Sequence, residues 1–355
     1  MRALALGLVL LVPAAVACLP EIEDPPISAT GEAPVGWTPA TAQSATGGTT
    51  AATGTSTTCS GVYFGNVPPI AGAPFVGTPC EVNGQLTPGA MTAAQIAQVA
   101  KVTKAGSLQI LAQDQWAKVA ALKSVSTLVL AGFVGQVAVG PATLDVTNAI
   151  NISGQMTGVG GFGGVKNLPG GLVIQSVPKL TAVTGFEGLQ SVGAVNISGS
   201  AVLKTINAFG ALKTAQSLYF ADFKTTTVGN TTTGIAFTPL KISTVNDVKF
   251  YNCQGLGTLN VLQTVGAMQS LELSNLDTGT LQFTALSQLA LLKLSGLPNL
   301  HSLDGLGSNL QVTGSLSLCD LGVTPEQRES WRAVHAPGLA IPKCATGCKG
   351  DGTCP

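Results

Sequence analysis

LVIQSVPKLTAVTGFEGLQSVGAVNI, residues 172–197, is the stretch that decides the fold. An apolar–x–apolar tripeptide stands at each end, Leu172-Val-Ile174 and Val195-Asn-Ile197. Such a tripeptide predicts a short strand whose first and third side chains point to the same face. The residues between the two tripeptides carry an apolar side chain at every third position, namely Leu180, Val183, Phe186, Leu189 and Val192. These residues are expected to face the interior as a second and a third wall.

The tripeptide recurs along most of the chain at nearly constant spacing. The start positions of the ten copies lie 20 to 24 residues apart, apart from one interval of 30 that inserts a Thr-rich loop near Phe223–Asn246. A short strand cannot bury its face alone, so each repeat must stack on its neighbours. The sequence therefore predicts a parallel β-solenoid of about ten turns. The copies start at Leu108, Leu128, Ile150, Leu172, Val195, Leu218, Val248, Leu271, Leu292 and Leu316.

A second ladder follows the strands, four residues after each start. Most of its members are Gly, Asn or Asp, which tolerate left-handed or sharply turned backbone. We therefore expect these positions to form a stacked corner with a structural role. They are Ala112, Gly132, Gly154, Ser176, Gly199, Asp222, Asn252, Asn275, Gly296 and Asp320.

Two repeats resemble a known family. Residues 172–189, LVIQSVPKLTAVTGFEGL, and residues 292–306, LKLSGLPNLHSLDGL, are similar to the leucine-rich repeats of receptor L-domains. Residues 91–110 also resemble the helix-then-strand entry of such domains, so the resemblance covers about residues 91–320. It implies a right-handed solenoid with a helical N-terminal cap, and a recognition role in place of catalysis.

Both ends of the repeat array carry helix-start signals. Thr92 and Gln95 form a capping-box pattern, and Thr324-Pro325 with Gln327 gives a second one. The second helix should close the stack with Trp331 as its plug and end at Gly338. The predicted segments are a signal peptide at 1–17, a disordered tether at 18–58, an N-terminal cap at 59–105, the solenoid at 106–320 and a Cys-rich cap at 321–355.

The N-terminus predicts export. Met1-Arg2 precedes an apolar run of 15 residues, 3–17, which is shorter than the roughly 18 to 20 that a spanning helix needs. Residues 15–18, Ala-Val-Ala-Cys, resemble a bacterial lipobox, which predicts lipidation of Cys18; plain cleavage after Ala17 fits as well. The next 40 residues are rich in Thr, Ala and Gly and suit a flexible spacer.

The cysteines of an exported chain are read first as disulfides. We expect Cys59–Cys80 in the N-terminal cap, with Cys253 as the odd thiol, buried as a small hydrophobic residue. Spacing does not determine the remaining connectivity, for which the preferred pairs are Cys319–Cys344 and Cys348–Cys354.

The sequence offers little that resembles catalytic machinery. Its 17 basic and 17 acidic residues give zero net charge, which argues against a nucleic-acid partner. The two histidines, His301 and His335, have no nucleophile–acid pattern around them, and the glycine-rich run at 158–164 is read as a tight turn. We expect no enzymatic activity, no cofactor and no metal. A carbohydrate-active β-helix enzyme is the weaker alternative.

A binding surface is better motivated. The middle residue of each tripeptide and the residue after it should point to solvent, and most of the middle residues are small or polar. A group on four adjacent turns is the exception and forms the candidate ligand site: Tyr219, Lys249, Tyr251, Glu272 and Lys293. The competing interpretation is a cross-strand charge ladder with tyrosines covering the sheet.

These observations together predict a non-catalytic recognition module of the bacterial cell envelope, carried on an outer-membrane lipid anchor and facing periplasm or surface. Its partner would be a protein or a glycan at the cell surface, and the membrane would be contacted through the anchor alone. Two alternative interpretations remain open. One is a structural surface protein without a specific ligand. The other is a eukaryotic secreted glycoprotein, because Asn151, Asn196 and Asn230 each begin a glycosylation sequon.

Overall fold

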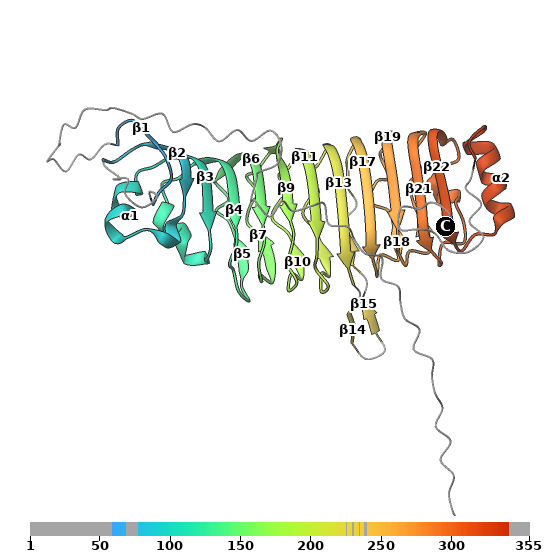
Figure 1. Ribbon diagram of the computed structural model, residues 1–355, viewed down its shortest axis with the longest axis horizontal. Helices are drawn as coiled ribbons and strands as arrows, with labels where there is room; N and C mark the ends of the chain where they lie inside the picture. The colour runs from blue at the N-terminus through green and yellow to red at the C-terminus, as the bar shows by residue number, and fades with distance from the viewer. Residues whose placement is uncertain are drawn as a thin grey trace, which may run out of the picture. The chain divides into compact units, whose positions relative to one another are not determined.

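The computed structural model describes residues 59–68, 77–224, 226–228, 231–233, 235–237 and 240–340. They form a parallel β-solenoid of about ten stacked coils, with strands that lie side by side in chain order (Figure 1). The strands of the main sheet, in spatial order, are β1 (Val62–Phe64), β2 (Glu81–Leu86), β3 (Lys104–Ile110), β4 (Ser124–Leu130), β6 (Asp145–Ile152), β9 (Gly171–Ile174), β11 (Ser191–Ser198), β13 (Thr214–Phe223), β17 (Thr244–Cys253), β19 (Ala267–Ser274), β21 (Gln288–Leu297) and β22 (Gln311–Leu321), with β8 (Asn167–Leu168) pairing β11.

Shorter strands build the other walls. A five-stranded parallel sheet contains β16 (Ala236–Phe237), β12 (Thr205–Ile206), β10 (Ala182–Val183), β7 (Gly158–Gly160) and β5 (Val137–Val139), in that order. A separate parallel pair consists of β18 (Thr258–Leu259) and β20 (Thr280–Leu281). The 30-residue interval contains an antiparallel hairpin, β14 (Thr226–Val228) and β15 (Thr231–Thr233), which projects from the stack (Figure 1). Three short 3-10 helices complete the turns: η1 (Pro88–Ala90), η2 (Gln113–Val119) and η3 (Asp304–Leu306).

The ten predicted tripeptides lie in strands of the main sheet, and the residues of their first and third positions are buried. The interior is filled by aliphatic side chains and by stacked phenylalanines. The rings of Phe162 and Phe186 lie 5.3 Å apart, and those of Phe186 and Phe209 lie 6.2 Å apart. The predicted inward positions Leu180, Val183, Phe186 and Leu189 are fully buried. The periodic apolar residues are therefore the core.

The corner ladder is confirmed at nine of its ten positions, which have positive φ angles between 51° and 110°. The described residues include five non-glycine residues with positive φ, and all five belong to this ladder: Ser176, Asp222, Asn252, Asn275 and Asp320. Left-handed backbone is costly for a residue with a side chain, and Asn and Asp offset part of the cost by local hydrogen bonds. Ala112 is the exception, because it is extended and precedes η2.

Both predicted capping helices are present. In α1 (Ala93–Val99) the Thr92 hydroxyl accepts from the N–H of Gln95, and in α2 (Pro325–His335) Thr324 does the same for Gln327. Trp331 is buried and stacks on His335, with ring centres 4.6 Å apart. Helix α2 covers the end of the stack beyond β22 (Figure 1).

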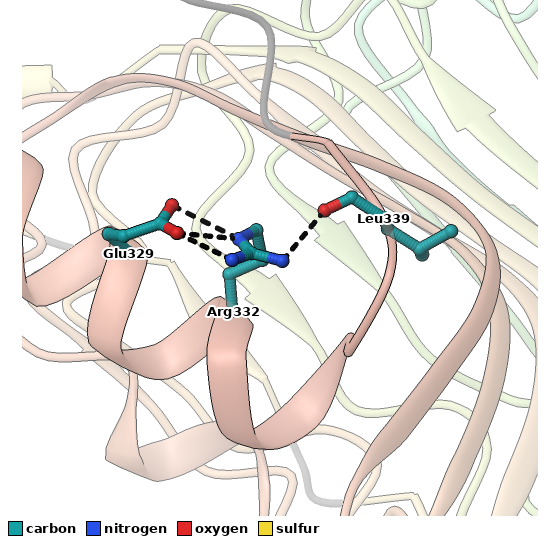
Figure 2. Close-up of polar contacts among 3 residues, drawn as sticks. All are labelled: Glu329, Arg332 and Leu339. Atoms are coloured by element: carbon teal, nitrogen blue, oxygen red, sulfur yellow. Dashed lines mark hydrogen bonds and ion pairs between the residues drawn. The ribbon is translucent and has the colours of Figure 1, made fainter.

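An arginine secures the chain that leaves this cap. Figure 2 shows Arg332 between the Glu329 carboxylate and the backbone carbonyl of Leu339. Its Nε lies 3.0 Å from each Glu329 oxygen, and its Nη1 donates to the Leu339 carbonyl at 3.0 Å. Leu339 packs on the core, so the last described residues remain against the solenoid.

One edge of the five-stranded sheet is closed by a side chain. Among the described strands, β5 pairs with β7 alone, and the Gln113 amide lies along its outer side. Gln113 Nε2 donates to the Val139 carbonyl at 2.9 Å, and Gln113 Oε1 accepts from the Val139 N–H at 3.1 Å. The side-chain amide therefore replaces the backbone of a missing strand, which leaves less of this edge free to pair with another chain.

Two features differ from the sequence analysis. The main sheet begins at β1, so strands already form within the segment predicted as a cap at 59–105. The glycine-rich run at 158–164 is not simply a turn, because Gly158–Gly160 forms β7 and only Gly161, with φ 87°, makes the corner. Glycine fits this strand because neighbouring side chains approach closely: a Cβ on Gly160 would lie 3.0 Å from Thr184 Oγ1.

Candidate functional site

Two columns on the outer face of the main sheet position the candidate site. The central column consists of the middle residues of the tripeptides, and strand register aligns Asn151, Val173, Asn196, Tyr219, Lys249, Glu272, Lys293 and Ser317. The outer column consists of the residues directly after the tripeptides, and register aligns Ser198, Ala221, Tyr251, Ser274, Ser295 and Cys319. The five predicted ligand-site residues are thus brought together, four in the central column and Tyr251 beside them.

The charged members of the central column interact directly. Lys249 Nζ lies 3.5 Å from Glu272 Oε2 and 5.9 Å from the centre of the Tyr219 ring. Both side chains of the ion pair remain partly in solvent, at 44% and 27% exposure. An exposed pair of this kind contributes about 0.2–1 kcal/mol, and a surface cation–π contact adds about 0.5–1 kcal/mol. The charge ladder expected as the competing interpretation is therefore present, but it is weak.

Tyr219 lies in a polar and partly buried environment. Burial raises the pKa of Tyr219, and the nearby Asp222 carboxylate, Cys253 and Tyr251 raise that pKa further. Asp222 in turn accepts a hydrogen bond from Asn252 Nδ2 at 2.9 Å. At neutral pH the phenol is therefore protonated and able to donate a hydrogen bond.

Sequence analysis assigned Asp222 and Asn252 only to the corner ladder and did not place them near Tyr219. The repeat spacing could have shown this proximity. Each corner residue lies three positions after a central-column residue on the same strand, as Asp222 does after Tyr219. Asn196 was also missed. Its Oδ1 is buried and has no hydrogen-bond partner among the described residues, and Asn196 is the register neighbour of Tyr219.

The surroundings of the tyrosines are flat. The residues flanking Tyr219 on the outer face are Ser217 and Ala221, and the next outer-column residue beyond Tyr251 is Ser274. The side chains of Tyr219, Lys249 and Tyr251 are all partly exposed. Their exposed parts are what a flat ligand or a partner surface would contact.

The predicted cysteine roles are confirmed where the structure describes them. Cys59 and Cys80 form a disulfide, and Cys253 is a free and buried thiol. Cys319 is disulfide-bonded, and its partner lies outside the described residues. Cys18, Cys344, Cys348 and Cys354 lie outside them as well, so the preferred pairs Cys319–Cys344 and Cys348–Cys354 and the lipidation of Cys18 remain predictions.

Other parts of the described chain offer less. A shallow cavity of about 390 Å³ lies against β20 and η3, with Gln263, Gln282, Ser302 and Asp304 among its lining residues. His301 and His335 each contact a backbone carbonyl, of Gly322 and Leu310 respectively. Within the described ranges, no group of three or more His, Cys, Asp and Glu residues is arranged to hold a metal ion. None of the helices described there is long and apolar enough to cross a bilayer.

Comparison of the chain with protein-family models, with curated proteins and with solved structures finds no match.

Proposed function

We propose that this protein is a non-catalytic recognition module of the cell envelope, exported and lipid-anchored through Cys18, similar to receptor L-domains in its use of a leucine-rich solenoid. The ligand binds on the outer face of the main sheet, at Tyr219, Lys249, Tyr251, Glu272 and Lys293. The partner is a protein or glycan at the cell surface.

One observation carries the proposal: two phenols and a lysine stand together on a sheet face that is otherwise small and polar. Tyrosine contributes both apolar area and a hydroxyl, and it is enriched where proteins bind partners.

The charges of the site bear on the partner. Lys249 and Lys293 lie among the carboxylates of Glu272, Asp222 and Asp247, so both signs of charge are interspersed at the site. A surface with mixed charges beside aromatic groups suits an uncharged glycan or a mixed protein surface better than a polyanion.

Replacing both tyrosines is the direct test. Each aromatic contact at the centre of an interface contributes about 2 kcal/mol or more, so Tyr219→Ala with Tyr251→Ala should weaken binding by at least 100-fold. The probes are an array of immobilised polysaccharides and outer-membrane vesicles, measured against the unaltered chain. Because both side chains lie outside the core, the melting temperature should stay within about 3 °C.

The matched control is Ser107→Ala with Thr127→Ala, two outer-face changes on the distant strands β3 and β4, which should leave binding unchanged. A double tyrosine variant that loses stability but binds its probe as well as the unaltered chain would assign the tyrosines to covering the sheet. That result would favour the structural surface protein.

The anchor has its own test. Native protein from fractionated cells should show a diacyl or triacyl mass increment on the peptide that begins at Cys18, and the protein should sediment with membranes. If the N-terminus is unmodified and the protein is in the soluble fraction, the protein is secreted and not lipid-anchored. The proposal that the outer sheet face binds a ligand is independent of this result.

A further inference from the structure

The shallow cavity beside β20 and η3 lies on a different wall of the solenoid from the candidate ligand face. Its volume of about 390 Å³ is within the range of about 300–1,000 Å³ that small-molecule sites occupy. Three successive turns, which follow β17, β19 and β21, line it. They contribute Gln263, then residues between Gly279 and Thr284, then Ser302, Asp304 and Gly305.

The backbone shapes this cavity. The parallel pair of β18 and β20 ends at β20, because the next turn forms η3 in place of a third strand. Helix η3 approaches β20 closely at Gly305, where a Cβ would lie 1.7 Å from the Leu281 carbonyl oxygen. The Phe283 N–H donates to the Gly305 carbonyl at 2.6 Å and holds the two turns together. The cavity therefore does not depend on the conformation of one side chain.

The polar side chains of the cavity have unused hydrogen-bonding capacity. Gln263 Nε2 donates to Gln282 Oε1 at 3.2 Å, which leaves the Gln263 oxygen and the Gln282 amide hydrogens available. The Ser302 hydroxyl accepts from the Asp304 N–H at 3.1 Å and keeps its own hydrogen to donate. The Asp304 carboxylate is exposed and makes no ion pair among the described residues. Donors and acceptors thus alternate over three turns.

This set of groups indicates the class of ligand. A carboxylate and an amide each present two polar atoms in one plane, which suits the adjacent hydroxyls of a sugar ring. Among the described residues that line the cavity none is Lys, Arg or His, and Asp304 would repel an anion. A divalent cation needs several oxygen ligands, and the cavity lining has a single carboxylate. A neutral ligand rich in hydroxyl groups fits best.

We propose that this cavity is a second ligand site, which binds a neutral saccharide unit through Asp304, Gln282 and Gln263. The inference does not rest on the function proposed above, because the cavity shares no residue with the ligand site on the main sheet. A soluble sugar and the end of a longer glycan present the same hydroxyls. Since an open cavity makes few contacts, we expect a dissociation constant of about 1 mM.

Saturation-transfer NMR on the full chain, with neutral mono- and disaccharides as probes, tests the site. Gln282→Ala with Asp304→Ala should weaken binding by at least about 10-fold, because both hydrogen-bonding groups are removed. Thr284→Trp should abolish binding by filling the cavity while every polar partner of the sugar remains. Gln282 and Asp304 are not in the core, and Thr284 is exposed, so the melting temperature of each variant should stay within about 3 °C.

Two control variants locate the binding. Asp145→Ala with Gln288→Ala, two exposed changes outside the cavity, should leave saccharide binding unchanged, and so should Tyr219→Ala with Tyr251→Ala. The proposal is overturned if no neutral saccharide binds at about 10 mM, if binding survives Thr284→Trp, or if only the tyrosine variant loses it. Immobilised polysaccharides of the bound sugar identify its source. Binding of the polymer indicates a glycan chain and binding of the sugar alone a soluble ligand; either result supports the site.

Discussion

Replacing Phe220 by alanine should lower the free energy of unfolding by about 3–5 kcal/mol. Phe220 is fully buried in β13 and stacks on Phe250 at a centroid distance of 4.9 Å. Its ring also meets Phe237 edge-on at 5.2 Å and lies 6.5 Å from Phe223. Truncation therefore removes a side chain that packs between neighbouring turns of the main sheet and against the second sheet. The cavity that remains destabilises the protein beyond the loss of buried apolar area.

Urea denaturation followed by circular dichroism measures this change. The matched control is Phe64→Ala, because Phe64 is 71% exposed on β1 and its loss should cost less than about 0.5 kcal/mol. A solenoid is stabilised mainly between neighbouring turns, so a weakened contact at β13 can also let the two halves unfold separately. A broadened or two-step transition supports the same conclusion. Equal costs at Phe64 and Phe220 would contradict it.

Much of the fold could be predicted from the sequence because its determinants are local. A tripeptide strand, a corner residue that tolerates positive φ and an apolar residue at every third position recur within each turn. Stacking then aligns like residues without any further information. The capping helices were equally readable, because Thr92 with Gln95 and Thr324 with Gln327 form their hydrogen bonds within four residues.

The first strands were not predicted, because their pattern is interrupted. In β2 the register against β3 shifts between Val82 and Gln85. Gly84 stands inside that shift, and a Cβ there would lie 2.0 Å from the Gly65 carbonyl oxygen. Period-based reading fails at such a bulge, because one extra residue reverses the alternation of inward and outward side chains.

The sequence predicted which residues of the candidate site align on the sheet face, but it did not predict their side-chain contacts. The recurring tripeptide aligned Tyr219, Lys249, Glu272 and Lys293 despite the 30-residue interval, because the strand register follows the tripeptides. The contacts of Asp222 with Asn252 and of Gln113 with β5 depend on side-chain conformation, which no spacing encodes.

Raising the pH from 8 to 11 should destabilise the unaltered protein by about 2–3 kcal/mol more than the Cys253→Ala variant. Burial raises the pKa of the Cys253 thiol from 9.0 to about 12, and backbone hydrogen bonds oppose that rise only in part. The folded state therefore holds the thiol proton at a pH where the unfolded chain has lost it. Each unit of difference in pKa corresponds to about 1.4 kcal/mol.

The sign follows from a pKa that is higher in the folded state. The stabilising contribution is complete below pH 9, decreases between pH 9 and 12, and is lost above the folded pKa. The two proteins differ only at residue 253, so the difference between the two alkaline slopes isolates Cys253. Unfolding free energies from urea denaturation at pH 8, 9.5 and 11 give these slopes. Parallel slopes would mean that the thiolate forms without penalty, which is incompatible with a thiol fully buried against Phe220 and Tyr251 carbonyls.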